Sequence, residues 1–179
     1  MYMKPLDKEQ YTDFELHYHY VTNAHYRVEM TDTKEEMAYR LVREDYDAPA
    51  EKSNIDTLYQ DYWTDAEAYA VCEDGTDEVL GYVEVAFEEW NNRLRMTQLL
   101  VNENSRGKGA GKFMVNFVKD MARERDYRVI VLEAQNYNIP AIDFYRSQGF
   151  RFCGGNVWFY SNIDIEDDEV MLEMSYLLD

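Results

Sequence analysis

Runs of apolar and β-branched residues recur along the chain and predict a series of strands. Residues 128–134 are apolar almost throughout, as in a strand buried on both faces of a sheet. Residues 67–73 and 79–87 are separated by an Asp-Gly turn signal and predict a β-hairpin. Two further strands are predicted at 14–30 and 93–101.

Other segments have the spacing of helices. Residues 33–46 carry apolar side chains at helical intervals, and Thr33 and Glu36 have the spacing of a capping box. A short helix is expected around Asn54–Trp63. The sequence therefore predicts two helices between the first strand and the hairpin.

Two more helices are predicted in the second half of the chain. In residues 110–126 one helical face carries Phe113, Met114, Phe117, Val118 and Met121. The other, from residue 139, has Pro140 in its first turn and Gly149 just past its end, which is the usual asymmetry of helix termini.

The tail adds two strands, at 151–162 and 169–178, with the acidic loop 164–169 between them. A hairpin followed by strand, helix, strand, helix and strand predicts an α/β fold with one sheet of mixed direction. At 179 residues, the chain is expected to form a single domain, 1–179.

Charge and composition limit the classes of molecule that the protein is expected to bind. The formal net charge is −18, which disfavours nucleic acid and anionic membrane surfaces and favours cationic molecules, or serves only solubility. No apolar run approaches the roughly 18–20 residues of a membrane span, and no signal peptide is visible. Cys72 and Cys153 lack a CxxC partner, which favours a reducing compartment and a cytoplasmic protein. The three histidines have no spacing that completes a metal site, so no metal is expected.

The stretch "NENSRGKGAGKF", residues 102–113, is the strongest candidate for chemistry. It lies between a predicted strand and a predicted helix, where free backbone N–H groups suit a phosphate. Phe113 stands where a P-loop needs Ser or Thr, which excludes that motif. Gly107, Gly109 and Gly111 give G-x-G-x-G and not the dinucleotide fingerprint G-x-G-x-x-G.

The pattern that fits is [RQ]-x-x-G-x-[GA], filled by Arg106, Gly109 and Gly111. It resembles motif A of the GNAT superfamily of acyl-CoA N-acyltransferases. The block "LEAQNYNIPAIDFYRSQGF", residues 132–150, is similar to the next GNAT block, with its Asn, its Tyr and its Gly-Phe pair. The resemblance implies the GNAT fold, with a mostly antiparallel mixed sheet flanked by helices and splayed central strands at the acetyl-CoA site.

A narrower resemblance is to streptothricin acetyltransferases, in the segments "EWNNRLRMTQLLV", "LEAQNYNIPAIDFYRSQGF" and "VWFYSN". It spans most of the chain and is dense from about residue 88 to 162. It implies acetyl-CoA as co-substrate and a small cationic amine as acceptor, with a streptothricin-type antibiotic as the first expectation. The residues that it implies for binding acetyl-CoA are Leu99, Leu100, Val101, Arg106, Gly107, Lys108, Gly109, Ala110, Gly111, Lys112, Asn138 and Tyr145.

The resemblance also assigns chemical roles. Tyr145 is implied to protonate the leaving thiolate, and a backbone N–H near Leu99–Val101 to polarise the thioester carbonyl. The relatives carry a Glu-Asp pair in the strand before the loop, and this chain has Thr97 and Gln98 there. Neither side chain is a general base near neutral pH. Glu133, which matches a family Glu, is the expected base, with Glu84 or a relay of water as the alternatives.

Other readings of the same chain stay open. The acceptor amine is alternatively that of a polyamine, an amino acid or a protein. The missing Glu-Asp pair also suits a protein that binds acyl-CoA as a sensor without catalysis. A homodimer through residues 169–178 is one expectation, and completion of the sheet by that strand is the other.

Overall fold

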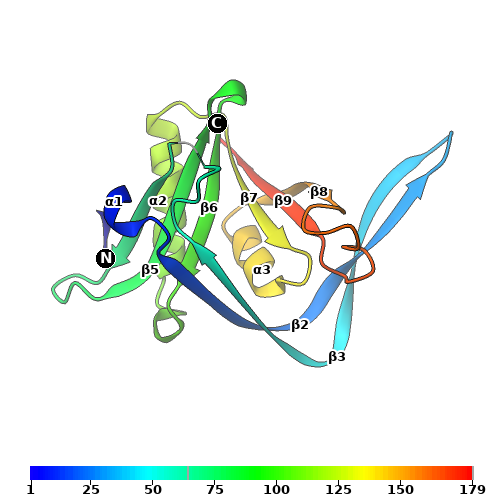
Figure 1. Ribbon diagram of the computed structural model, residues 1–179, viewed down its shortest axis with the longest axis horizontal. Coiled ribbons are helices and arrows are strands. Elements are labelled where there is room, and N and C mark those ends of the chain that lie inside the picture. Colours follow the sequence, from blue (N-terminus) through cyan, green and yellow to red (C-terminus); the bar gives the residue numbers. More distant parts are fainter. Residues whose placement is uncertain (64, 179) are drawn as a thin grey trace. The chain divides into compact units, whose positions relative to one another are not determined.

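The computed structural model describes residues 1–63 and 65–178 (Figure 1). The chain divides into two compact units. Unit 1 comprises Met1–His19, Ser53–Leu132 and the C-terminal segment from Ser175, and unit 2 comprises Tyr20–Lys52 and Glu133–Met174. Among the described residues, no helix is both long enough and apolar enough to cross a membrane.

Strands outnumber helices in both units. The strands are β1 (Tyr2–Pro5), β2 (Glu15–Asp32), β3 (Met37–Thr57), β4 (Glu67–Cys72), β5 (Val79–Glu88), β6 (Arg93–Val101), β7 (Val129–Gln135), β8 (Arg151–Asn156) and β9 (Met171–Leu177). The helices are α1 (Lys8–Tyr11), α2 (Ala110–Glu124) and α3 (Ile139–Ser147), with 3₁₀ turns at η1 (Glu89–Asn91) and η2 (Glu103–Ser105).

The larger sheet has the hydrogen-bonded order β1-β4-β5-β6-β7-β9-β8, and β2 pairs with β3 in a second sheet. The pairs β1–β4, β4–β5 and β5–β6 are antiparallel, whereas β6 and β7 run parallel. This mixed, mostly antiparallel α/β arrangement confirms the fold class predicted from the sequence.

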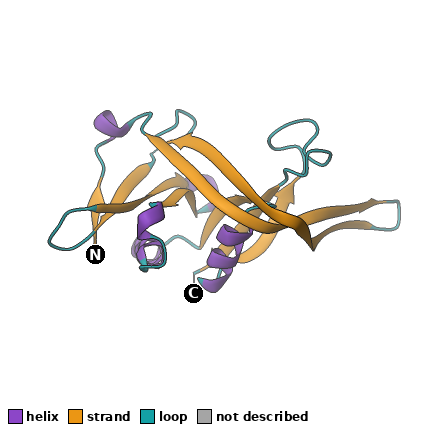
Figure 2. Ribbon diagram, turned by 90° about the horizontal axis from the view of Figure 1, so that it is seen from below, coloured by secondary structure: helices purple, strands orange, loops and turns teal. Residues whose placement is uncertain are grey.

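The predicted helix at 33–46 is wrong. β2 and β3 run side by side as two long strands (Figure 2), and Thr33 and Glu36 form the turn between them. The Thr33 hydroxyl accepts the Glu36 N–H at 3.0 Å, as it would at a helix N-cap, but the chain then pairs with β2. Cross-strand pairing outweighs a local preference that is worth only tenths of a kcal/mol per residue.

The short helix predicted around Asn54–Trp63 is also wrong. β3 continues to Thr57, and a turn follows it, in which Trp63 N–H donates to the Gln60 carbonyl at 2.9 Å. The Leu58 N–H donates to Phe14 and the Asp13 N–H donates to Leu58, so this segment is anchored to the start of β2. These hydrogen bonds join residues that are far apart in the sequence, so a local sequence pattern cannot predict them.

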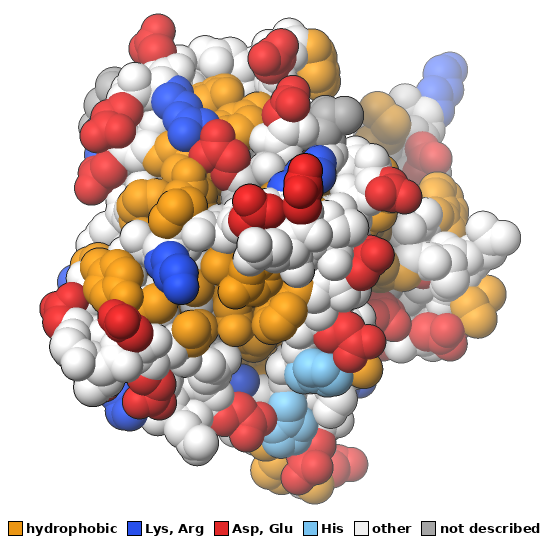
Figure 3. Space-filling view, turned by 60° about the vertical axis from the view of Figure 1, so that its left-hand side comes forward, with side chains coloured by type: hydrophobic (Ala, Val, Ile, Leu, Met, Phe, Trp, Pro, Cys, Tyr) orange, Lys and Arg blue, Asp and Glu red, His pale blue; other side chains and the backbone are white. Residues whose placement is uncertain are grey.

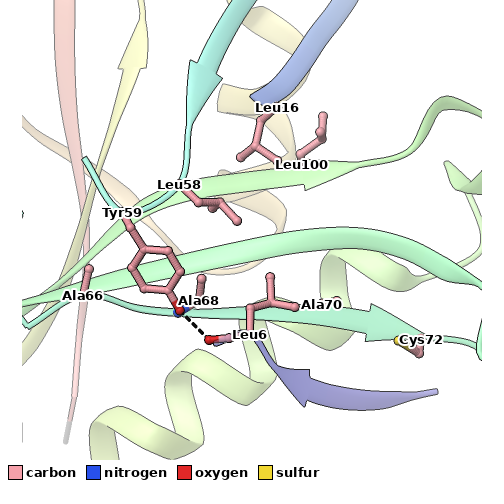
Figure 4. Packing of buried hydrophobic residues seen from close by; sticks show 9 residues of the cluster. All are labelled: Leu6, Leu16, Leu58, Tyr59, Ala66, Ala68, Ala70, Cys72 and Leu100. Carbon is pink, nitrogen blue, oxygen red and sulfur yellow. Dashed lines mark hydrogen bonds between the residues drawn. The ribbon is translucent and has the colours of Figure 1, made fainter. Parts of the chain in front are cut away.

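The core of unit 1 lies where the first strands meet the segment around Leu58 (Figure 4). Leu16 and Leu58 are fully buried, and Leu100 of β6 belongs to the same cluster. The Tyr59 hydroxyl donates to the Leu6 carbonyl at 2.7 Å, which satisfies the polar end of a buried ring. Helix α2 packs against β4, β5 and β6 through its buried apolar stripe of Ala110, Met114, Val115, Val118, Met121 and Ala122.

Gly81 of β5 lets β5 and β6 approach closely. A Cβ atom at this position would lie 2.3 Å from the Leu100 carbonyl oxygen, which is backbone and has no rotamer to escape. We expect Gly81→Ala to destabilise the fold by about 1–3 kcal/mol, the usual cost of overpacking. Chemical denaturation measures this, with Gly154→Ala as the matched control, because a Cβ at Gly154 meets nothing within 4 Å. Equal stability of the two variants would contradict the expectation.

Candidate active site

The glycine loop connects β6 to α2 within unit 1. Gly107 and Gly109 have φ angles of +76° and +91°, a region that L side chains rarely adopt. Gly109 is the N-cap of α2 and has no side chain to cap the helix, so the first N–H groups of α2 receive no side-chain hydrogen bond. An uncapped helix start after two such glycines favours an anion as the missing partner.

The basic residues of the loop differ in what they contact. Arg106 donates from Nη2 to the His19 carbonyl at 2.7 Å, so its guanidinium is anchored to β2. Lys108 and Lys112 are exposed. Neither lysine has an ion pair within residues 1–63 and 65–178. The two lysines therefore keep their charge available to a ligand beside the helix start.

The strand before the loop alternates between buried and half-buried residues. In the register, Tyr82 faces Leu100 and Gly81 faces Val101 on β5. Leu100 is buried in the core of unit 1, while Leu99 and Val101 are half-buried. The side chains thus have a packing role, and only the main chain of this stretch remains for binding a ligand.

A β-bulge interrupts β6 at Thr97, one of the two positions where the resemblance implied a Glu-Asp pair. Glu84 faces Gln98 and Val85 faces Met96, so Thr97 is the extra residue. The Thr97 hydroxyl donates to Glu84 Oε1 at 2.7 Å, and the Tyr59 N–H donates to Glu84 Oε2 at 2.6 Å. Glu84 is 0% exposed, and its burial raises the pKa of the carboxyl group.

Gln98, the neighbour of the bulge, is also held by a polar network. Its side chain is 6% exposed, accepts from the Tyr18 hydroxyl at 2.7 Å and donates to Asp56 Oδ2 at 2.7 Å. Thr97 and Gln98, which stand where carboxylates were expected, are thus each hydrogen-bonded to a carboxylate of another strand, Glu84 of β5 and Asp56 of β3. Sequence reasoning had no signal for Asp56, because its partner is 42 positions away.

In unit 2, Tyr145 of α3 has a free hydroxyl in an apolar setting. The residue is 8% exposed, and its ring packs at 5.8 Å from that of Phe150. Burial raises the pKa of the hydroxyl above its ordinary value. Within the described part of the chain the hydroxyl has no hydrogen-bond partner, so it remains available as a proton donor.

Asn138 and Glu133, also in unit 2, each have a partner. Asn138 is the N-cap of α3 and accepts the Ala141 N–H at 3.2 Å through its side chain. Glu133 is exposed and accepts from the Tyr160 hydroxyl at 2.7 Å. Its hydrogen bond gives Asn138 a structural role that needs no ligand. The carboxylate of Glu133, in contrast, faces solvent.

Asn136 is a residue that sequence reasoning missed. It is 0% exposed and donates to the Tyr26 carbonyl at 3.0 Å and to Asp168 Oδ1 at 3.1 Å, while it accepts the Val170 N–H at 2.8 Å. Asn136 therefore joins β2, β7 and the segment before β9 in unit 2. Its place between the predicted strand 128–134 and the predicted helix from residue 139 gave no signal of this role.

The acidic loop 164–169 is built into unit 2. Asp164 is buried and accepts the N–H groups of Phe159, Tyr160 and Ser161. Asp168 and Glu169 bind His25 and Tyr137. Much of the loop's acidity thus serves internal contacts. No group of three or more metal-ligating side chains is found among the described residues, and the expected lack of a metal stays a prediction.

Comparison with known proteins places this architecture in a family. The acetyltransferase (GNAT) family matches residues 35–150. Streptothricin acetyltransferase of Streptomyces lavendulae is 32% identical over 135 residues, or 70% of this chain and 71% of that protein. The Escherichia coli streptothricin acetyltransferase is 28% identical over 142 residues, or 79% and 76% of the two chains.

Solved structures of other proteins have the same fold. The crystal structure of a nourseothricin acetyltransferase superposes with a TM-score of 0.76 at 26% identity and covers 99% of this chain and 98% of its own. A Bacillus anthracis protein crystallised with acetyl coenzyme A has the same fold, with a TM-score of 0.73 at 22% identity over 99% and 97% of the two chains. The family predicted from the loop is confirmed, and the chain belongs to the acetyltransferase (GNAT) family.

Proposed function

We propose that the protein transfers the acetyl group of acetyl-CoA to an amine of a streptothricin-type antibiotic. The uncapped start of α2, with its two positive-φ glycines and two exposed lysines, is the observation that carries the acetyl-CoA part. Relatives named streptothricin acetyltransferases, which align with 70–79% of the chain, support the acceptor.

The residues present fit an acyl-CoA. A Cβ at Gly107 would meet nothing within 4 Å, so the open side of the loop has room for a pyrophosphate against the backbone. The N–H groups of Gly107 to Lys112 would hold the phosphates, and Lys108 and Lys112 would add charge. The main chain of Leu99 to Val101 would contact the pantetheine and the acetyl group. Asn138 supports this arrangement as the N-cap of the helix that carries Tyr145.

Acetyl transfer then needs three proton movements. An acceptor amine with a pKa of about 10.4 is about 99.9% protonated at neutral pH, so a proton must leave before the nitrogen attacks the thioester carbon. As the C–N bond forms, the C–S bond breaks, the nitrogen releases its second proton to water, and the thiolate takes a proton. We assign this last transfer to Tyr145, whose hydroxyl stays protonated because burial raises its pKa, and which regains its proton from solvent after the transfer.

For the first transfer, we assign Glu133 as the base. Its carboxylate is exposed, so it can accept a proton directly or through water. Glu84 has no exposed surface and both of its oxygens accept hydrogen bonds, so a substrate cannot reach it. Glu84 therefore serves the structure around the bulge and not the proton transfer.

The charge of the protein suits this acceptor. The net charge is −18, and acidic side chains are spread over the face in Figure 3, with few lysines and arginines among them. Such a field raises the rate at which a cationic molecule arrives and repels nucleic acid and anionic membranes. A cytoplasmic, metal-independent enzyme and a homodimer remain part of the proposal.

The test is a thiol-release assay with acetyl-CoA and a panel of acceptors, namely streptothricin, a polyamine, an aminoglycoside and a lysine peptide. We expect the highest kcat/KM with streptothricin. A higher kcat/KM for another amine would support the acetyltransferase activity and identify that amine, in place of streptothricin, as the acceptor. If acetyl-CoA raises the melting temperature but no amine causes release of the thiol, the result would favour a protein that binds acyl-CoA as a sensor without catalysis.

A further inference from the structure

Asp56, at the end of β3 in unit 1, is a half-buried carboxylate held by neutral donors alone. Its Oδ1 accepts the Thr57 N–H at 2.7 Å and the side-chain amide of Gln60, and its Oδ2 accepts Gln98 Nε2 at 2.7 Å. A carboxylate has about four lone-pair sites, two on each oxygen. Oδ1 is therefore filled, and Oδ2 has one acceptor site left.

No cation compensates this charge. Within the described residues Asp56 has no ion pair, and after burial its charge is a further cause that raises the pKa of Glu84. The Tyr18 hydroxyl of β2 contacts Gln98 and not Asp56. A carboxylate partly withdrawn from water without a paired cation is costly, and a cation that binds Asp56 would offset that cost.

We propose that Asp56 binds the ammonium group of the acceptor amine, an inference that rests on the proposed function. Gln98 fixes Oδ2 of Asp56, and the next residue along β6 is Leu99, whose main chain we assign to the acetyl group. An ammonium on Oδ2 would therefore lie beside the strand that carries the acceptor's reaction partner. Asp56 thus selects cationic amines and positions them, while proton removal belongs to another group.

The contacts also indicate how tightly this carboxylate is positioned. Gln98 is itself held by Tyr18, so the chain Tyr18–Gln98–Asp56 fixes Oδ2 through two hydrogen bonds of 2.7 Å. The Thr57 N–H and the Gln60 amide fix Oδ1. A carboxylate held in this way loses little side-chain entropy when an ammonium binds. Its binding is therefore more specific than that of a flexible carboxylate on the surface.

The test compares Asp56→Asn with Asp61→Asn. Asn keeps an oxygen for the Thr57 N–H and removes the charge, and Asp61 is an exposed matched control five positions away. We expect Asp56→Asn to lower kcat/KM for the amine by about 10- to 100-fold, mainly through KM, because a charge-assisted hydrogen bond is lost. The KM for acetyl-CoA and the kinetics of Asp61→Asn should not change.

The pH dependence separates binding from a structural role. As the pH rises toward the pKa of the amine, about 10.4, the acceptor loses its charge and the deficit of Asp56→Asn should narrow. Asp56→Glu, which keeps the charge, should recover more of the rate than Asp56→Asn. A deficit that is constant with pH, or a parallel loss of acetyl-CoA affinity, would overturn the assignment while the proposed function stands. A wild-type protein that acetylates no amine would overturn both.

Discussion

Replacing Tyr145 with Phe should lower kcat by roughly 100-fold and leave the melting temperature unchanged. A positioned proton donor usually contributes between about 10² and 10⁴ in rate. The hydroxyl has no hydrogen-bond partner within the described residues, so its removal leaves no orphaned group and the apolar packing against Phe150 remains. Steady-state rates of thiol release with saturating acetyl-CoA and amine measure the effect.

A pH profile and a matched control variant distinguish the loss of a proton donor from other causes of a lower kcat. Since burial raises the pKa of the hydroxyl, Tyr145 stays protonated at neutral and mildly alkaline pH, and the deficit should be the same at pH 7 and pH 9. Tyr39→Phe is the control, because among the described residues the buried Tyr39 hydroxyl has no hydrogen-bond partner, and we expect wild-type turnover from it. Wild-type turnover from Tyr145→Phe would remove Tyr145 from the proton transfer.

Replacing Asn136 with Ala should destabilise the protein by about 3–5 kcal/mol. The change leaves the buried Tyr26 carbonyl and the buried Val170 N–H without their partner, and it removes one of the contacts of the partly exposed Asp168. Each buried polar group left unpaired costs about 1–3 kcal/mol. For a chain of this length the melting temperature should fall by about 10 °C.

Differential scanning calorimetry checks this expectation, with Asn162→Ala as the control. Asn162 is exposed in the same unit, so its replacement should shift the midpoint by less than about 2 °C. A drop of similar size in both variants, or in neither, would show that the network around Asn136 does not stabilise unit 2. Because Tyr145 lies in unit 2 as well, Asn136→Ala should also lose activity at a lower temperature than the wild type.

The elements that the sequence predicted correctly are those with strong local signals. The buried run of β7, the turn of the β4–β5 hairpin and the glycine before α2 specify their structure within a few residues. Asn138 and Gly149 likewise bound α3, with the Asn side chain as N-cap and the glycine at a φ of +89°. The loop motif was predictable for the same reason, because positive φ angles require glycine.

What the sequence concealed depends on partners that are far apart along the chain. Thr33 caps a hairpin turn in place of a helix, because the residues after it pair with β2. Asp56 reaches Gln98 only after β3 and β6 have folded against one core. A carboxylate in an acidic chain gives no local signal that it lacks a cation, so the sequence alone did not point to Asp56 as a candidate for binding the acceptor.

The most direct test of the central claim is the mass of the product formed from streptothricin and acetyl-CoA in the presence of the purified protein. The proposed function predicts the gain of one acetyl group on an amine nitrogen, formed at the rate of thiol release and absent when acetyl-CoA is omitted. Unmodified streptothricin after complete incubation, from a protein that binds acetyl-CoA, would contradict it.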